Sequence, residues 1–156
     1  MKDYFSDEIL KVLFNQDSNG CLIQSESYDI EYKLNFNVDS DIVKTMNGLA
    51  NNRGGYIIFG INPNDRSLSG LNKEKLKFYN EKIDSEDVRG RIISSCQPNI
   101  EFKHFTYALG MSMFILFYVN ESNNKPHIFD RNMDTIKPGD IFYRYNDSIK
   151  KFNMPN

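Results

Sequence analysis

The chain has 156 residues, 40% of them hydrophobic, which is enough apolar material for a single globular domain with its own core. Its formal net charge of −2 argues against a strongly basic protein that binds nucleic acid indiscriminately. No apolar run approaches the roughly 20 residues that span a bilayer, and the start MKDYFSDEIL is too acidic for a signal peptide, so we expect a cytoplasmic protein.

The first predicted element is a short helix in an N-terminal helical arm, residues 1–20, which precedes the main domain, residues 21–156. Ser6 can cap this helix, and the apolar residues after it fall on one side: Ile9, Leu10, Leu13 and Phe14. The turn formers NQDSNG then end the helix. In YDIEYKL, residues 28–34, apolar and charged side chains alternate, which predicts a strand with one buried face.

A longer helix is predicted next, capped by Asp39 or Ser40 and carried by apolar residues at helical spacing as far as Ala50. Gly54 can adopt the left-handed conformation that ends a helix. Directly after it, GGYIIFGIN has the β-branched and aromatic density of a buried strand. A helix, a tight glycine pair and a central strand are therefore expected in succession.

The second half of the chain mixes helices and strands. One or two helices are predicted in residues 72–97, and they must end before Pro98. Two strand-like runs surround Gly110 as a hairpin, and IFYRYN, residues 141–146, predicts a final short strand. The pattern indicates an α+β fold with a mixed, mainly antiparallel sheet packed with helices.

Several kinds of site are disfavoured by the sequence. Cys21 and Cys96 lack the paired spacing of a zinc site, so we expect free thiols. His104 and His127 are the only histidines, and without a partner at metal-ligand spacing we interpret both as structural. The stretch GGYIIFG lacks the Lys-Ser/Thr ending of a phosphate-binding P-loop.

Three charges share one face of the strand in YDIEYKL, because Asp29, Glu31 and Lys33 stand at every second position. If the chain before the strand folds back, Glu26 can lie beside Glu31. Two adjacent carboxylates favour a hard cation such as Mg²⁺, and a lysine beside them can stabilise negative charge on a phosphate. The alternative is the wet face of an edge strand, where such charges discourage aggregation.

The order of several motifs resembles the Schlafen-type AlbA domain, a nucleic-acid-binding module of bacterial regulators and defence proteins and of the animal Schlafen nucleases. The motifs are ESYDIEYK, the AN-x-x-GG turn that ends at Gly55, the later Gly60 and Gly70, and a Tyr-x-Tyr strand that carries Arg144. The resemblance covers roughly residues 21–152 and implies the AlbA-like fold. It also implies binding of nucleic acid, with RNA preferred.

In nuclease members of that family, two glutamates and a third acidic residue hold the metal. The resemblance therefore implies a Mg²⁺- or Mn²⁺-dependent endoribonuclease acting on structured RNA such as tRNA, with Glu26, Glu31 and Lys33 as catalytic residues. This sequence has Pro63 where the third acid is expected, so Asp65 would complete the metal site, or Asn62 would supply a neutral oxygen.

Contacts to phosphate are expected from cations in the later part of the chain, because residues 1–31 carry a charge of −5 and the remainder therefore carries +3. Arg144 stands alone on the strand face opposite its flanking tyrosines. Arg53 adjoins the glycine pair, and Lys150 and Lys151 follow the last strand. The same cations can simply face water, and a non-catalytic interaction module, as a homo-oligomer or with a partner subunit, stays a third alternative.

Overall fold

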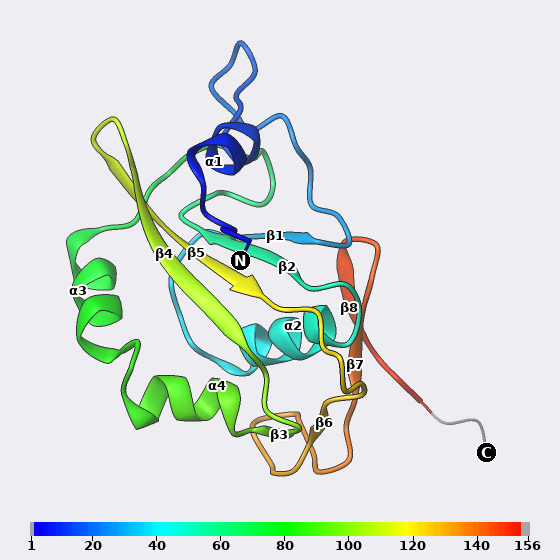
Figure 1. Ribbon diagram of the computed structural model, residues 1–156. Coiled ribbons are helices and arrows are strands. Elements are labelled where there is room, and N and C mark those ends of the chain that lie inside the picture. Colours follow the sequence, from blue (N-terminus) through cyan, green and yellow to red (C-terminus); the bar gives the residue numbers. More distant parts are fainter. Residues whose placement is uncertain (1, 154–156) are drawn as a thin grey trace.

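The centre of the protein is a four-stranded mixed sheet with the strand order β1-β2-β5-β4 (Figure 1). The computed structural model describes residues 2–153. The strands are β1 (Ile30–Lys33), β2 (Gly55–Phe59), β4 (Phe102–Leu109) and β5 (Ser112–Val119). β1 runs parallel to β2, and the other pairs are antiparallel, which confirms the predicted α+β class with its mainly antiparallel sheet.

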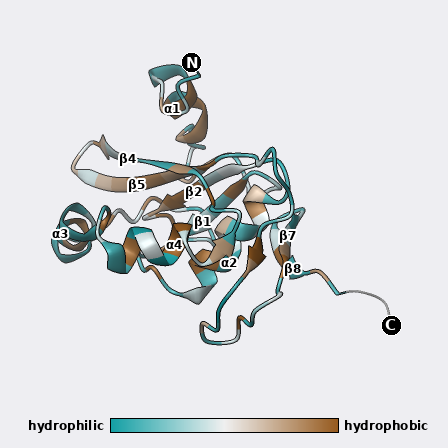
Figure 2. Cartoon of the chain, turned by 60° about the horizontal axis from the view of Figure 1, so that its bottom comes forward, coloured by the Kyte–Doolittle hydropathy of each residue, from teal (hydrophilic) through white to brown (hydrophobic). Residues whose placement is uncertain are grey.

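Helices cover both faces of this sheet. On one side lies α1 (Asp7–Leu13), and on the other lie α2 (Ser40–Ala50), α3 (Lys73–Lys82) and α4 (Arg91–Ile93), as Figure 2 shows with the sheet between them. A π-helical turn, Glu86–Gly90, leads into α4. None of the described helices has the length and apolar content needed to cross a bilayer.

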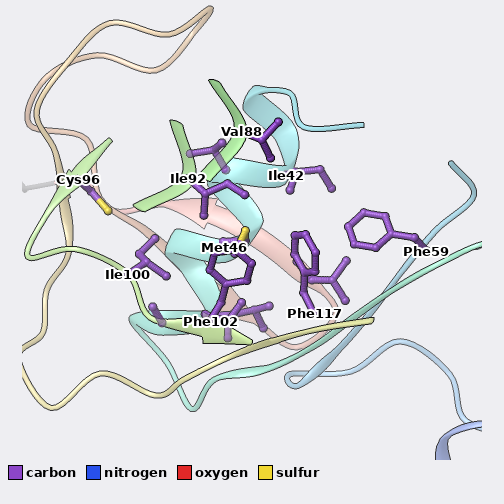
Figure 3. Packing of buried hydrophobic residues seen from close by; sticks show 14 of the residues in the cluster. Ile42, Met46, Phe59, Val88, Ile92, Cys96, Ile100, Phe102 and Phe117 are labelled. Atoms are coloured by element: carbon purple, nitrogen blue, oxygen red, sulfur yellow. The ribbon is translucent and has the colours of Figure 1, made fainter. Parts of the chain in front are cut away.

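Two apolar cores result, because neighbouring residues of a strand point to opposite faces of the sheet. On β2, Ile57 and Phe59 join the core formed with α2, whereas Ile58 joins the core under α1. Figure 3 shows the larger core, in which Met46 of α2 lies among residues from α4 and the strands. The continuous apolar run of β2 is therefore explained by burial on both faces.

A β-hairpin formed by β7 (Phe142–Tyr145) and β8 (Ser148–Lys151) packs against α2 and extends the predicted final strand. Asn146 makes its turn with φ +54°, as an asparagine can. At Gly48 of α2, a Cβ atom would lie 2.6 Å from Cδ1 of Ile149. The missing side chain therefore allows the hairpin to lie directly on the helix.

Asn47 of α2 and Asn51, the C-cap residue of α2, fix the position of the hairpin relative to the helix. The Asn47 side chain accepts from the Phe142 amide at 2.9 Å and donates to the His127 carbonyl at 3.0 Å. The Asn51 side chain accepts from the His127 amide at 2.7 Å and donates to the Phe142 carbonyl at 2.8 Å. The segment around His127 includes β6 (Ile128–Phe129), which pairs with β3 (Cys96–Gln97).

Candidate functional site

Arg144, on β7, lies at the centre of the candidate site, and its side chain is fully buried. The guanidinium donates to the Ser27 carbonyl through Nε at 3.0 Å and Nη2 at 2.8 Å, and to the Ile30 carbonyl through Nη2 at 2.9 Å. Its Nη1 donates to Oε1 of Glu31 at 2.5 Å in a charge-assisted bond. Arg144 therefore ties the hairpin to β1 and to the turn before it.

This geometry corrects the expectation that Arg144 contacts a phosphate. Its side chain does lie on the strand face opposite Tyr143 and Tyr145, as predicted, but that face is covered by α2 and the edge of the sheet. Hydrogen bonds already occupy four of the five N–H groups of the guanidinium. Arg144 positions Glu31 and does not present its charge at the surface.

Glu31 and Lys33 lie on the α2 side of β1, because Glu31 is paired across the sheet with Ile57 of that core. Lys33 Nζ lies 3.2 Å from Oε2 of Glu31 and 2.6 Å from Oδ2 of Asp41, in the first turn of α2. Burial lowers the pKa of Lys33, but the hydrogen bond to Asp41 and the charge of Glu31 outweigh it and raise the pKa. With only 12% of the Glu31 side chain exposed, the wet edge-strand alternative is wrong for Glu31.

Glu26 folds back against β1, as the sequence predicts, and its Oε2 accepts from the Tyr32 amide at 3.0 Å. This amide is on the outer edge of the sheet and would otherwise lack a ladder partner. Burial raises the pKa of the Glu26 carboxyl, and the neighbouring Glu31 carboxylate raises it further, against the hydrogen bond from Tyr32 and the charge of Arg144. The structure thus brings Glu26, Glu31 and Lys33 together.

Two other acids from the sequence analysis lie elsewhere. β1 begins at Ile30, so Asp29 precedes the strand, and its Oδ1 accepts from the Ser27 hydroxyl at 2.8 Å. The predicted face of three charges therefore reduces to Glu31 and Lys33. Asp65 is exposed, and hydrogen bonds from the hydroxyl and amide of Ser67 lower its pKa.

In this arrangement cations of the protein already occupy the Glu31 carboxylate. One oxygen of Glu31 is held by Arg144 and the other by Lys33, so two positive charges already neutralise it. Within residues 2–153, no three His, Cys, Asp or Glu side chains gather as a potential metal site. The structure therefore does not bring Asp65 to Glu26 and Glu31, and the predicted metal set of these three acids is not assembled among the described residues.

The remaining predicted cations are at the surface. Arg53 is exposed, with its guanidinium carbon 5.3 Å from the centroid of the Tyr28 ring. Lys150 is exposed and its Nζ lies 4.9 Å from the centroid of the Tyr145 ring. Lys151 is half-exposed and pairs with Asp140 at 3.0 Å. All three are accessible to a ligand, unlike Arg144.

Asp41 is the site residue that sequence reasoning missed. It lies inside the predicted helix, where an acid in the first turn is explained by the helix dipole alone. Its pairing with Lys33 arises only when α2 packs beside β1. The cysteines are both free, and the ring Nδ1 atoms of His104 and His127 bond to the Tyr79 hydroxyl and to the Pro98 carbonyl, in agreement with their predicted structural roles.

The fold defines an AlbA-like α+β domain, together with the acidic cluster at its edge strand that is formed by Glu26, Glu31 and Asp41 with Lys33 and Arg144. A family model described as Schlafen, AlbA_2 matches residues 26–153, which include both glutamates, Lys33 and the hairpin. The chain belongs to this family. The match begins at Glu26, after α1.

Relatives support the fold. An uncharacterized ATP-binding protein of Ureaplasma parvum is 32% identical over 93% of the chain, which spans 44% of that protein's length. A crystal structure of a Corynebacterium diphtheriae protein matches 92% of this chain, which covers 25% of that protein's chain, with TM-score 0.58 and 12% identity. The N-terminal domain of a putative ATP-dependent DNA helicase RecG-related protein from Nitrosomonas europaea matches 85% of the chain and 88% of its own, with TM-score 0.52 and 21% identity.

The two cations that bind Glu31 differ in burial, and we expect different costs when each is removed. Arg144→Met leaves Oε1 of the buried Glu31 and the carbonyls of Ser27 and Ile30 without their donor, and it should lower the free energy of unfolding by about 3 kcal/mol or more. Lys33→Met removes a partly exposed partner and should cost about 1 kcal/mol or less. Urea unfolding of the two variants measures this difference. Equal losses of unfolding free energy would show that Arg144 does not contribute more to stability than Lys33.

The stability contribution of Glu26 should depend on pH. Its folded pKa is raised above 4.5, so its contribution is present below that pH and is lost as the pH rises through the folded value. Glu26→Gln keeps an acceptor for the Tyr32 amide without the charge. We expect the variant to match the wild type near about pH 4 and to be more stable near about pH 7. A difference in unfolding free energy that is the same at both pH values would contradict this assignment.

Proposed function

We propose that this domain binds nucleic acid in the cytoplasm, with RNA preferred over DNA, and that its exposed cations contact the phosphates. The observation that carries the proposal is the outer face of the β7–β8 hairpin. There Lys150 lies across from Tyr143 in the strand register and beside the ring of Tyr145, which is 54% exposed. An aromatic ring with an ammonium group beside it can stack on a base while the ammonium group contacts a phosphate of the nucleic-acid backbone.

Two further features support this proposal. Arg53 presents a second exposed cation next to an exposed tyrosine, Tyr28. The Schlafen AlbA_2 family is associated with nucleic acid, and the name of one structural relative describes it as related to a DNA helicase. The overall charge of −2 is compatible with binding because residues 1–31 carry −5 and the remainder of the chain carries +3.

Binding through phosphates should weaken steeply as salt rises from about 50 mM to about 200 mM. Fluorescence anisotropy with tRNA and with DNA of similar length measures the affinity. The double variant Lys150→Gln, Lys151→Gln should bind both more weakly and reduce the slope of log K against log salt by about 1 for each phosphate that is no longer neutralised. Lys73→Gln with Lys77→Gln removes the same charge from the exposed part of α3 and should bind like the wild type.

Two outcomes would overturn the proposal. One is absence of binding to either nucleic acid at the lowest salt. The other is an equal loss of affinity in the α3 control, because that would show a response to net charge alone. Tighter binding of DNA than of tRNA would overturn the RNA preference and leave nucleic-acid binding in place.

Endoribonuclease activity is a second candidate, and the observation that favours it is the adjacency of Glu26 and Glu31 beside Lys33. If this candidate holds, structured RNA incubated with Mg²⁺ or Mn²⁺ is cut by the wild type, and chelation of the metal stops the cleavage. Glu31→Gln should then abolish cutting, and Lys33→Gln should reduce it. Equal cutting by wild type and Glu31→Gln would identify a contaminating nuclease.

A further inference from the structure

A cleft of about 320 Å³ lies away from the acidic cluster, on the α1 side of the sheet. It is bordered by the N-terminal segment, the turn before β1, the α2–β2 turn and β5. Four tyrosines line it: Tyr4, Tyr28, Tyr56 and Tyr118. This volume is at the lower end of the range of small-ligand pockets, and it suits a group about the size of a nucleobase.

Three of the tyrosines form a fixed wall. Tyr4 and Tyr118 stack with their ring centroids 3.7 Å apart and an angle of 13° between the planes. Tyr56 meets Tyr118 edge-on at 4.9 Å, and its hydroxyl donates to the Tyr4 carbonyl at 2.8 Å. Tyr56 and Tyr118 are also partners across β2 and β5. These contacts hold the wall in place before any ligand arrives, which limits the entropy cost of binding.

The fourth tyrosine leaves its ring accessible. Tyr28 is 44% exposed and comes from the turn before β1, and Arg53 lies over its ring. Arg53 covers part of the ring, and the remaining exposed ring surface can stack on an aromatic ligand. Arg53 can meet a phosphate without leaving the edge of the cleft.

The charges around the cleft favour a base over a bare anion. Lys2 and Lys103 each have Nζ 5.2 Å from the centroid of the Tyr4 ring, and Arg53 adds a third cation. Asp29 and Glu121 line the same cleft, and Glu121 also pairs with Lys125, whose Nζ lies 3.2 Å from its Oε2. A polyphosphate would meet both carboxylates, whereas a neutral aromatic base with one flanking phosphate would not suffer this repulsion.

We propose that this cleft binds one unpaired base of a single-stranded nucleic acid, stacked on Tyr28, with the adjacent phosphate at Arg53. The inference rests on the proposed nucleic-acid binding and gives it a base-binding site separate from the hairpin. Stacking of this kind tolerates any base, so the cleft would select unpaired over paired nucleotides without selecting a sequence.

The test compares three ligands built on one strand of fixed length: a short single-stranded RNA, its duplex with the complementary strand, and the same single strand with abasic sites. We expect the single strand to bind the wild type most tightly. Tyr28→Ala should weaken its binding at least about fivefold, which corresponds to about 1 kcal/mol. The abasic strand should bind wild type and Tyr28→Ala equally, because its phosphates remain but nothing can stack.

Ile23→Ala is the matched control, since Ile23 is 51% exposed in the neighbouring groove that Tyr28 also lines. It should bind the single strand like the wild type, and thermal unfolding should show that both variants are folded. Photocrosslinking of a halogenated strand, mapped by mass spectrometry, should mark Tyr28 or the tyrosine wall.

The outcomes separate this inference from the proposed function. If the wild type binds no RNA at low salt, the proposed function fails and the cleft proposal fails with it. If the wild type binds but Tyr28→Ala binds equally well, the cleft proposal alone is overturned. If a free nucleoside monophosphate binds as tightly as the strand and with the same dependence on Tyr28, the cleft is a nucleotide site and the strand proposal is overturned.

Discussion

The burial of one guanidinium determines how the site is built. Removing an arginine from water costs several kcal/mol, and the cost is offset only when nearly all of its N–H groups find partners. Arg144 meets this condition with two backbone carbonyls and the carboxylate of Glu31. The carbonyls of Ser27 and Ile30 are presented together because the chain turns just before β1. The positions of the hairpin, the turn and Glu31 thus depend on one another.

This dependence divides the conspicuous charges into two groups. Glu31 and Lys33 are neutralised inside the cluster, so their first role is to hold β1, α2 and the hairpin together. Arg53 and Lys150 lie outside the cluster beside exposed rings, so they remain available to a ligand. A residue's place in a family motif therefore does not by itself show that its charge faces the substrate.

Much of the fold could be predicted from the sequence because its signals are local. Alternation marked β1, helical spacing with the Asp39 cap marked α2, and the apolar run marked β2. β8 was missed, because SIKK has little β-branched or apolar character and forms a strand only by pairing with β7. The β3–β6 pair was missed for a different reason, because each strand has only two residues and too short a pattern to recognise.

The candidate site was predictable where it depends on the fold-back before β1 and unpredictable where it depends on packing between distant elements. The approach of Glu26 to Glu31 follows from a turn of a few residues. The burial of Arg144 follows from contact of β7 with α2 and β1, which strand alternation alone cannot reveal. The tyrosine cleft likewise assembles Tyr4, Tyr28, Tyr56 and Tyr118 from four separate segments.

The side chains of Asn47 and Asn51 have a mechanical consequence. Each amide joins the segment around His127 to the start of the hairpin, and both amides project from the same end of one helix. If the hairpin slid along the helix, the buried amide groups would lose their hydrogen-bond partners, so small displacements are resisted. The helix end, the loop and the hairpin should therefore shift as one rigid block or separate in a single step.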